Sequence, residues 1–215
     1  MKKTLYIFGA GGFGKEVLDI VRAGYQDTYK HVAFLDDGVE NGTTIVNTKV
    51  EGGMDTARAL SPETCEFVIA LGSPALRKRL THMIADMGHS FATLIDPTAI
   101  IQPSATIGEG TIVLPRVVVS SAAHIGQHCL LNIGAIVGHD VKMDDFVVVS
   151  PAAVLLGNTY FAEGVEVGSS ATLYPGIKVG AWAKIAMCSA VYKDVPEEAT
   201  VAGTPARIMR IKKDS

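Results

Sequence analysis

Charge is scarce in this sequence: only 19% of its 215 residues are Asp, Glu, Lys or Arg, whereas 48% are hydrophobic. A chain of this composition buries enough apolar surface to offset the conformational entropy lost on folding, which excludes intrinsic disorder. Its formal net charge is −3, whereas nucleic-acid-binding domains usually carry an excess of basic residues. We therefore expect a folded protein that does not bind nucleic acid.

Long hydrophobic runs are missing as well. The stretch between Arg116 and Asp140 has no Asp, Glu, Lys or Arg, but its Ser120, His124 and Asn132 are residues that a membrane interior would not accommodate. Near the N-terminus, the apolar run at residues 4–8 is too short for a signal peptide. We expect no membrane association and a mature cytoplasmic N-terminus.

Only three cysteines are present, and Cys65, Cys129 and Cys188 form no C-x-x-C pair. An odd number of widely spaced cysteines is typical of reduced thiols in a cytoplasmic protein. Covalent catalysis would require Cys188 as the nucleophile. It has no histidine close to it in the sequence and lies beside Met187, so we do not assign it this role.

The charges are unevenly distributed, with 21 in residues 1–94, 11 in residues 95–191 and 9 in residues 192–215. The middle segment is thus about half as charged per residue as the first, which predicts a domain boundary near residue 94. We expect domains at residues 1–93 and 94–195, followed by a C-terminal tail at 196–215.

The middle segment repeats with a period of six. Every sixth residue from Ile95 to Val191 is hydrophobic, and a second register, from Ala99 to Val195, is small or β-branched. This period fits neither a helix nor the two-residue alternation of a sheet, and a β-sandwich does not hold one period over 97 residues. It is the signature of a parallel β-helix with apolar side chains stacked inside.

Turn-forming residues recur beside these registers. Glycine, aspartate and asparagine are the residues that most readily adopt positive backbone φ angles. We therefore expect positive φ at Gly108, Gly126, Asn132, Gly138, Asp144, Gly168 and Gly180.

The first domain reads as a Rossmann-like α/β unit. A strand at residues 3–8 precedes the G-x-G-x-x-G segment, residues 9–14, and a helix; a second strand at 31–35 ends in Asp36 and Asp37. This pattern is typical of a phosphate-binding βαβ unit. A third strand at 67–71 and a helix at 74–87 follow, so the domain has room for one nucleotide but not for NAD. We interpret Arg77, Lys78 and Arg79 as a solvated helix face.

Several segments together carry a resemblance: the glycine-rich loop, residues 34–37, residues 69–72 with the basic run at 76–79, the hexapeptide array, and the terminal segment at 201–207. The chain resembles the sialic acid O-acetyltransferase family of hexapeptide acyltransferases. Its features are most similar to those of the bacterial nucleotide-linked 4-amino-sugar N-acetyltransferases of the bacillosamine and perosamine type. The similarity covers essentially the whole chain.

The resemblance implies a left-handed β-helix that forms a homotrimer, with active sites between subunits and acetyl-CoA as co-substrate. It also implies a cytoplasmic bacterial enzyme of lipopolysaccharide biosynthesis that needs no metal. The implied reaction is acetyl transfer to the 4-amino group of a UDP- or GDP-linked amino sugar. The nucleotide base and the sugar stereochemistry stay open.

The family's catalytic segment matches Asn132, His139 and Asp140 in this sequence. An imidazole exchanges protons near neutral pH, so His139 is the expected general base for the ammonium group of the sugar. Asp140 is expected to hold the imidazole, which requires a bend because adjacent strand residues point to opposite faces. Gly157, eighteen residues after His139, matches the glycine whose amide faces the thioester carbonyl.

The remaining expected contacts follow from the same resemblance. Lys184, Lys193 and Arg207 are candidates for the coenzyme phosphates, with a solvated charge as the alternative; Asp36 and Asp37 are nucleotide contacts or strand-end caps. Two family histidines are replaced here by Phe13 and Val148. The expected coenzyme-binding residues are Gly157, Ser169, Lys184, Ala186, Met187 and Arg207, and the expected substrate-binding residues are Gly9, Gly11, Gly12, Phe13, Gly14, Asp36, Asp37 and Gly72.

Three other functions share part of this pattern. A sialic acid O-acetyltransferase would share the fold, the coenzyme and His139. A γ-type carbonic anhydrase uses this β-helix with a zinc ion bound by three histidines, but His124, His128 and His139 do not have its H-x4-H spacing. A non-catalytic binding protein with a decayed site is disfavoured because Asn132, His139 and Gly157 are all present.

Overall fold

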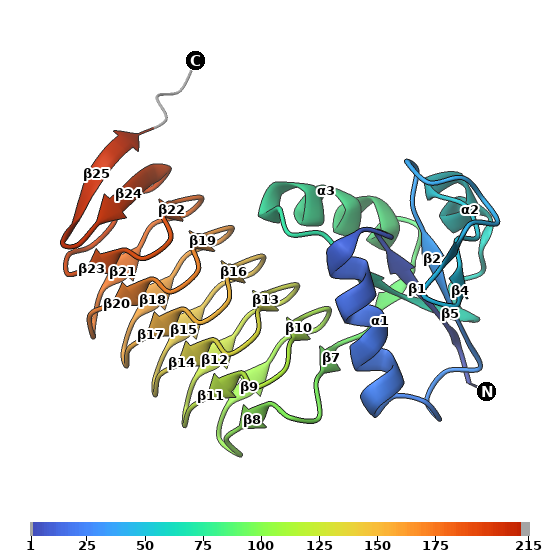
Figure 1. The fold of residues 1–215 in the computed structure, drawn as a ribbon, viewed down its shortest axis with the longest axis horizontal. Coiled ribbons are helices and arrows are strands. Elements are labelled where there is room, and N and C mark those ends of the chain that lie inside the picture. The colour runs from blue at the N-terminus through green and yellow to red at the C-terminus, as the bar shows by residue number, and fades with distance from the viewer. Residues whose placement is uncertain (1, 212–215) are drawn as a thin grey trace. The chain divides into compact units, whose positions relative to one another are not determined.

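The chain forms two compact units, which Figure 1 draws as a ribbon. The computed structural model describes residues 2–211, and these divide between Pro97 and Thr98. The division lies four residues beyond the domain boundary expected between residues 93 and 94. Within residues 2–211, no helix has the length and apolar character needed to cross a membrane.

The first unit is an α/β fold around a four-stranded parallel sheet with strand order β2-β1-β5-β6. All five residues of the central strand β1 are buried, as expected for a parallel strand covered on both faces. The elements of this unit are β1 (Thr4–Phe8), α1 (Gly12–Gly24), β2 (His31–Leu35), β3 (Thr44–Ile45), β4 (Thr48–Lys49), α2 (Met54–Ala59), β5 (Cys65–Ile69), α3 (Pro74–Ala85), β6 (Ser90–Phe91) and β7 (Leu94–Ile95). The predicted Rossmann-like order of strands and helices is confirmed.

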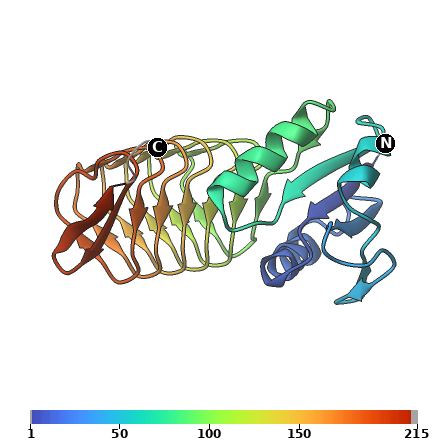
Figure 2. The ribbon, with the colours of Figure 1, turned by 90° about the horizontal axis from the view of Figure 1, so that it is seen from above.

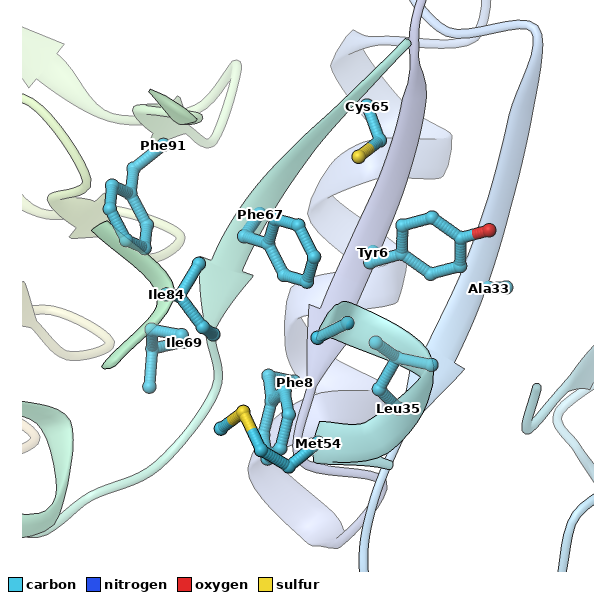
Figure 3. Packing of buried hydrophobic residues seen from close by; sticks show 11 residues of the cluster. Tyr6, Phe8, Ala33, Leu35, Met54, Cys65, Phe67, Ile69, Ile84 and Phe91 are labelled. Carbon is cyan, nitrogen blue, oxygen red and sulfur yellow. The ribbon is translucent and has the colours of Figure 1, made fainter. Parts of the chain in front are cut away.

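Aromatic side chains form much of the core of this unit (Figure 3). Phe67 lies at its centre, with ring centroids 5.7 Å from Tyr6 and 4.6 Å from His89. Helix α1 adds the apolar side of an amphipathic sequence, because Val17, Leu18, Ile20 and Val21 are all nearly inaccessible to solvent. The core therefore fixes the strands whose carboxyl ends carry the glycine-rich loop.

The strand order creates a switch point between β1 and β5. The chain leaves β1 toward β2 on one side and leaves β5 toward β6 on the other. In parallel α/β sheets, ligands bind in the crevice at the carboxyl ends of strands where the connections diverge in this way. The loop at residues 9–11 follows β1 and the loop at residues 70–73 follows β5, so both lie at this position.

Arg77 overturns one expectation. Its side chain is fully buried, and Nη1 donates hydrogen bonds to the carbonyl oxygens of Ile69 at 2.7 Å and Leu71 at 3.2 Å. The interpretation of residues 77–79 as a solvated helix face is therefore wrong for Arg77. Instead, this guanidinium joins α3 to the end of β5 and holds the loop that leads to Gly72.

The second unit is a left-handed β-solenoid of about six turns, in which three short strands make one turn (Figure 2). Its strands stack into three parallel sheets. The first sheet contains β10 (Ile112–Val113), β13 (Leu130–Leu131), β16 (Val148–Val149), β19 (Glu166–Val167) and β22 (Lys184–Ile185). The second contains β8 (Ile100–Ile101), β11 (Val118–Val119), β14 (Ile136–Val137), β17 (Val154–Leu155), β20 (Thr172–Leu173) and β23 (Ala190–Val191). The third contains β9 (Thr106–Ile107), β12 (His124–Ile125), β15 (Lys142–Met143), β18 (Tyr160–Phe161) and β21 (Lys178–Val179).

The predicted inward stacking is confirmed. In the second sheet Val119 pairs with Val137, Val137 with Leu155, and Leu155 with Leu173, each step spanning eighteen residues. All four side chains are 0% exposed. Because every inward position meets its equivalent on the next coil, the interior needs no charge, which accounts for the charge-poor middle of the sequence.

Positive φ angles occur once per hexapeptide, but not where we expected them. The prediction for Gly108, Gly126, Asn132, Gly138, Asp144, Gly168 and Gly180 is wrong. A Cβ on any of the five glycines of that set would overlap backbone atoms of the next coil, so they are required by close packing and not by φ. The positive values lie two residues later, at Gly110, Arg116, Ala122, His128, Gly134, Asp140, Phe146, Ala152, Asn158, Gly164, Ser170, Gly176, Trp182 and Cys188.

Backbone hydrogen bonds between coils stabilise these corners. The left-handed region costs an L-residue roughly 1–2 kcal/mol. From His128 to Cys188 the residue in this conformation donates its amide to a carbonyl of the coil before it, as Asp140 does to Ser121 O at 3.1 Å and Asn158 to His139 O at 2.9 Å. Arg116 and Ala122 donate to the side-chain hydroxyls of Thr98 and Ser104 instead. The corner ladder thereby permits residues other than glycine.

The segment expected as a C-terminal tail contains a hairpin. Strands β24 (Ala199–Gly203) and β25 (Ala206–Ile211) pair in antiparallel register, and β24 extends the first sheet through its parallel pairing with β22. Val201 is buried, in register with Ile185. The hairpin therefore closes the C-terminal end of the stacked interior.

Truncating one inward side chain tests this packing. We expect Leu155→Ala to lower the free energy of unfolding by about 2–5 kcal/mol, because the cavity would lie between Val137 and Leu173. Chemical denaturation followed by circular dichroism measures it. Lys142→Ala, on the exposed face of the third sheet, is the matched control and should change the value by less than about 0.5 kcal/mol. Equal effects of the two substitutions would contradict the stacked core.

Candidate active site

His139 and Asp140 form an ion-pair-type contact at a corner of the solenoid. The distance from His139 Nδ1 to Asp140 Oδ2 is 2.8 Å, and the two side chains are 64% and 53% exposed. Adjacent strand residues would point to opposite faces, but Asp140 has a φ of 59° and the chain bends there. The bend that such a pair requires is therefore present.

The contact decides which nitrogen of His139 is available. An ionised carboxylate only accepts hydrogen bonds, so the proton of a neutral imidazole lies on Nδ1, facing Asp140. Nε2 is then the unprotonated nitrogen, ready to accept a proton. It lies above Gly157, where a Cβ would be only 2.5 Å from Nε2.

Gly157 occupies the corner beneath the imidazole of His139. It is the corner residue stacked directly below His139, and its carbonyl accepts a hydrogen bond from Gly176 at 3.1 Å. Its own amide donates no hydrogen bond within the described chain. A residue without a side chain and with an amide that has no acceptor thus lies beneath the imidazole, and a backbone amide of this kind is suited to an acyl group that carries developing negative charge.

Asn132 lies at a different corner from His139. We name the corner between the second and third sheets the histidine edge; it contains residues 120–122, 138–140, 156–158, 174–176 and 192–194. We name the corner between the first and second sheets the asparagine edge; it contains residues 114–116, 132–134, 150–152, 168–170 and 186–188. Strand β14 separates Asn132 from His139, so they lie roughly 20 Å apart within one chain. The Oδ1 atom of Asn132 accepts the amide of Ile133 at 2.8 Å.

The expected coenzyme-binding residues divide among several places. Ser169, Ala186 and Met187 lie on the asparagine edge, and Met187 is 71% exposed. Lys184 lies on the outer face of the first sheet and forms an ion pair with Glu166 at 2.6 Å. Only Gly157 lies beside His139, so one chain does not bring these residues together.

Arg207 and Lys193 lie near each other at the end of the solenoid. Arg207 is an exposed residue of β25, and it lines a cavity of about 430 Å³ together with Lys193 and Tyr192. Of the three basic residues expected to meet coenzyme phosphates, these two therefore share one location.

The glycine-rich loop contains glycines of two kinds. Gly9 has a φ of 110° and a Cβ there would lie 2.7 Å from Ala70 O, whereas Gly14 packs against Gly9 O. These two are required by the fold. Gly11 and Gly12 face open space, and so does Gly72 on the loop after β5. The described structure thus leaves these three positions free of neighbours at the switch point, beside the half-buried Phe13.

Asp36 and Asp37 are used for backbone hydrogen bonds. Asp36 accepts from Ala10 and Gly38, both at 2.8 Å, and so attaches the glycine-rich loop to the end of β2. Asp37 accepts the amide of Met54 at 2.7 Å and caps α2. Of the two alternatives stated for this pair, the geometry corresponds to strand-end caps.

The histidines do not share a site. His124 contacts Thr106 Oγ1 on the third sheet, whereas His128 is buried and stacks on Phe146 with centroids 5.3 Å apart. Among residues 2–211 no group of three or more His, Cys, Asp or Glu side chains is arranged to hold a metal ion. The geometry gives the zinc alternative no support.

The cysteines offer no nucleophile paired with His139. Cys188 is exposed on the asparagine edge, away from the histidine edge. Cys129 is buried inside the solenoid, and burial raises the pKa of the Cys65 thiol, which favours its neutral form. Within one chain, no thiol therefore lies next to the imidazole of His139.

Sequence reasoning missed two exposed aromatic residues on the histidine edge. Tyr174 and Tyr192 occupy equivalent positions on successive coils, and their ring centroids are 5.8 Å apart. The eighteen-residue spacing already relates them to Gly138 and Leu156, so a search by coil and not by hexapeptide would have found the column.

Comparison with known proteins gives the context of this site. The family model of the PglD N-terminal domain matches residues 4–84. The chain is 30% identical over 216 residues to GDP-perosamine N-acetyltransferase of Escherichia coli O157:H7, and the match covers 95% of each protein.

Solved structures agree with this result. The acetyltransferase domain of PglB from Neisseria gonorrhoeae FA1090, solved with acetyl coenzyme A, superposes with a TM-score of 0.91 at 33% identity, covering 97% of this chain and all of that one. PerB from Caulobacter crescentus, in complex with CoA and GDP-perosamine, gives a TM-score of 0.89 at 27% identity, covering 96% of this chain and 97% of that one.

The fold and these similarities define an acetyltransferase built on a left-handed β-helix with an N-terminal α/β domain. Within this class, the chain belongs to the family of nucleotide-sugar N-acetyltransferases that includes GDP-perosamine N-acetyltransferase.

Alanine substitutions at two glycines of this edge, Gly157 and Gly138, should affect activity and stability differently. In Gly157→Ala the new methyl group would displace the exposed imidazole of His139, so we expect about a 100-fold loss of activity with an almost unchanged unfolding transition. In Gly138→Ala the methyl group would meet the Gly157 backbone nitrogen at 2.7 Å and cannot move it, so we expect a loss of about 1–3 kcal/mol of stability. Activity assays and thermal unfolding of both variants measure this contrast, and a fully active Gly157→Ala enzyme would contradict it.

Proposed function

We propose that this enzyme transfers the acetyl group of acetyl-CoA to the 4-amino group of a nucleotide-linked amino sugar, UDP- or GDP-linked. The observation that carries the proposal is the position of His139: its Nδ1 contacts Asp140, and its imidazole lies over Gly157, where a Cβ would be 2.5 Å from Nε2. The relatives described above support the choice of donor and of acceptor class, because acetyl coenzyme A and GDP-perosamine are named in their descriptions.

In the proposed reaction, His139 acts as general base. An amino sugar in water is largely an ammonium ion, which has no lone pair for attack until it loses a proton. Nε2 accepts that proton, and the carboxylate of Asp140 stabilises the resulting imidazolium through Nδ1. The amine then attacks the thioester carbonyl. As the C–S bond breaks, the thiolate takes the proton from the imidazolium of His139 and the new amide nitrogen loses its second proton to water, so the coenzyme leaves as the free thiol and one proton is released.

Gly157 stabilises the charge that develops during attack. Its amide has no hydrogen-bond acceptor in the described chain, and Gly157 lies beneath the imidazole of His139. A donor that is already oriented toward the forming oxyanion costs no reorganisation at the moment of reaction. The thioester oxygen is its partner in this proposal.

The α/β domain holds the nucleotide of the acceptor. Gly11, Gly12 and Gly72 are unobstructed at the switch point, which is the place for a ligand in such a sheet. Asp36 positions the loop through Ala10 and is in our proposal an indirect contributor. Phe13 and Val148 stand where some family members carry histidines, so the contacts to sugar and base differ here.

A homotrimer with active sites between subunits is part of the proposal. The outward side chains of the second sheet are mainly apolar, with Ile100 56% and Ile136 42% exposed, whereas those of the third sheet are polar. An exposed apolar ladder of this kind indicates a protein interface. It separates the histidine edge from the asparagine edge, so a neighbouring copy packed on it is the way to bring Asn132 and Met187 close to His139.

The expected setting is a bacterial cytoplasm, in the biosynthesis of lipopolysaccharide. Nucleotide-linked amino sugars and acetyl-CoA are both water-soluble metabolites. The three reduced cysteines and the free thiol product fit a reducing compartment.

Release of free thiol from acetyl-CoA tests the reaction. We expect release with a UDP-, GDP- or dTDP-linked 4-amino sugar and none with sialic acid, and the product should be an amide by mass spectrometry. His139→Ala should lower kcat by about 100- to 10,000-fold. Asp140→Asn, which tolerates the positive φ, should cost less because the base remains.

The outcomes are distinct. Thiol release with sialic acid alone would show an O-acetyltransferase and overturn the N-acetyl assignment. An undiminished rate in His139→Ala would remove this residue as the base while leaving the acetyl transfer itself in place.

The interface is tested by placing a charge on the apolar ladder. Ile136→Glu should convert the trimer to monomers, because a carboxylate would be desolvated in the interface, and activity should fall with it. Lys142→Glu on the third sheet is the control and should leave both unchanged. Sedimentation velocity and the thiol assay provide the two measurements. A monomeric wild-type protein with full activity would refute the shared site.

A further inference from the structure

On one side of strand β5 the sheet ends early. Strand β6 ends at Phe91, and Ala92 N, just after it, donates to Phe67 O at 2.8 Å. The carbonyl groups of Ile69 and Leu71 come later along the chain, beyond the register in which β6 pairs with β5. Carbonyl groups withdrawn from solvent need a hydrogen-bond donor, so a group other than a strand amide must supply it here.

Arg77 takes the place of the missing strand. Its side chain is 0% exposed, and Nη1 donates to Ile69 O at 2.7 Å and to Leu71 O at 3.2 Å. The two carbonyl groups therefore point to the same side of the chain, toward α3. Because a guanidinium is planar and holds its donors in fixed directions, it also fixes the peptide planes of both carbonyls.

The amide that follows the second carbonyl points the opposite way. In a planar trans peptide the C=O and N–H groups face opposite directions. The peptide of Ile69 shows this pattern, because its carbonyl points to Arg77. Its N–H, which belongs to Ala70, donates to Phe8 O on β1 at 2.8 Å. By the same geometry Gly72 N points to the β1 side, past the last residue of β1, which is the switch point of the sheet.

This amide is available to a ligand. Gly72 N donates no hydrogen bond within residues 2–211, and a Cβ on Gly72 would meet no atom within 4 Å. The loop that carries it packs on the glycine-rich loop, since a Cβ on Gly9 would lie 2.7 Å from Ala70 O. A cation behind the peptide and an N–H group in front of it suit an oxygen atom that carries negative charge.

We infer that Arg77 is a positioning residue for the acceptor: it holds the Leu71 carbonyl and thereby directs the Gly72 amide toward an oxygen atom of the nucleotide's diphosphate. The inference rests on the proposed function, which puts the nucleotide at this switch point. Arg77 itself touches no substrate. Without its guanidinium the peptide between Leu71 and Gly72 is free to rotate and to present a carbonyl oxygen, which repels a diphosphate.

Steady-state kinetics separate this role from a purely structural one. Arg77→Met keeps a long side chain but has no donor. We expect its KM for the nucleotide-linked 4-amino sugar to rise about tenfold, with kcat within about twofold and KM for acetyl-CoA unchanged, because the lost interaction is remote from the reacting atoms. A substitution that only reduced the amount of folded protein would lower the apparent kcat and leave both KM values unchanged, and that result would overturn the inference.

Arg79→Met is the matched control. Arg79 lies on the same helix α3 but is exposed, so this substitution removes the same side chain without changing the end of β5. It should leave kcat and both KM values unchanged. An equal rise of the nucleotide-sugar KM in Arg79→Met would show a general effect of charge on α3 and contradict the role of Arg77.

A measurement on the wild-type protein does not depend on how well a variant folds. When UDP or GDP is added, the NMR signal of the Gly72 amide should shift and its exchange with solvent should slow, because the amide gains an anionic acceptor. An unchanged signal at saturating nucleotide would overturn the inference. Uridine and guanosine lack the diphosphate and should leave the signal unchanged, so an equal shift with the nucleoside would contradict the assignment to the diphosphate.

Calorimetric titration with UDP, GDP and dTDP separates this inference from the proposed function. Wild-type protein that binds none of the three would contradict the proposed function itself, since the α/β domain would then hold no nucleotide. A nucleotide that binds wild type and Arg77→Met with equal affinity would contradict only the role of Arg77.

Discussion

Hydrogen bonds between the backbones of successive coils determine the repeat length and the stacking of the solenoid. Backbone amides of one coil donate hydrogen bonds to carbonyl oxygens of the next, as Gly138 N does to Leu155 O at 2.7 Å. A strand residue is thereby paired with its equivalent eighteen positions later, as Val137 is with Leu155. Buried backbone groups require such partners, so the coils must keep one length. The inward apolar columns, the low charge and the crowded glycines all follow from this repeat.

The active corner also depends on the ladder. The bond from the Asp140 amide to Ser121 O stabilises a backbone conformation that an aspartate adopts at low cost. That conformation turns two consecutive side chains toward each other, which a strand does not allow. The next corner places a glycine under the imidazole, so two successive coils supply the base, its carboxylate partner and a free amide.

The sequence predicted the solenoid well because every inward position repeats one physical requirement. Its failures occurred where contacts depend on the third dimension. Positive φ was expected at glycines such as Gly138, but backbone crowding between coils, invisible in one hexapeptide, selects glycine there. Arg77 looked solvated within a basic run, yet its guanidinium satisfies two buried carbonyls at the end of β5. For Asp36 and Asp37 the sequence left nucleotide contact and strand-end cap open, because the amides of Ala10 and Met54 that they accept lie far from them in the chain.

His139 and Gly157 occupy equivalent positions on successive coils, so the distance between them is set by the length of one coil. Insertion of one residue into a strand between them would shift the register of the hydrogen bonds between the two coils. Insertion of a complete coil would preserve the fold but move the Gly157 amide about 4.8 Å away from the base. The coils after Gly157 lie beyond this pair, so their number does not affect the distance between base and amide. The segment from His139 to Gly157 is therefore the part of the solenoid whose length this distance fixes.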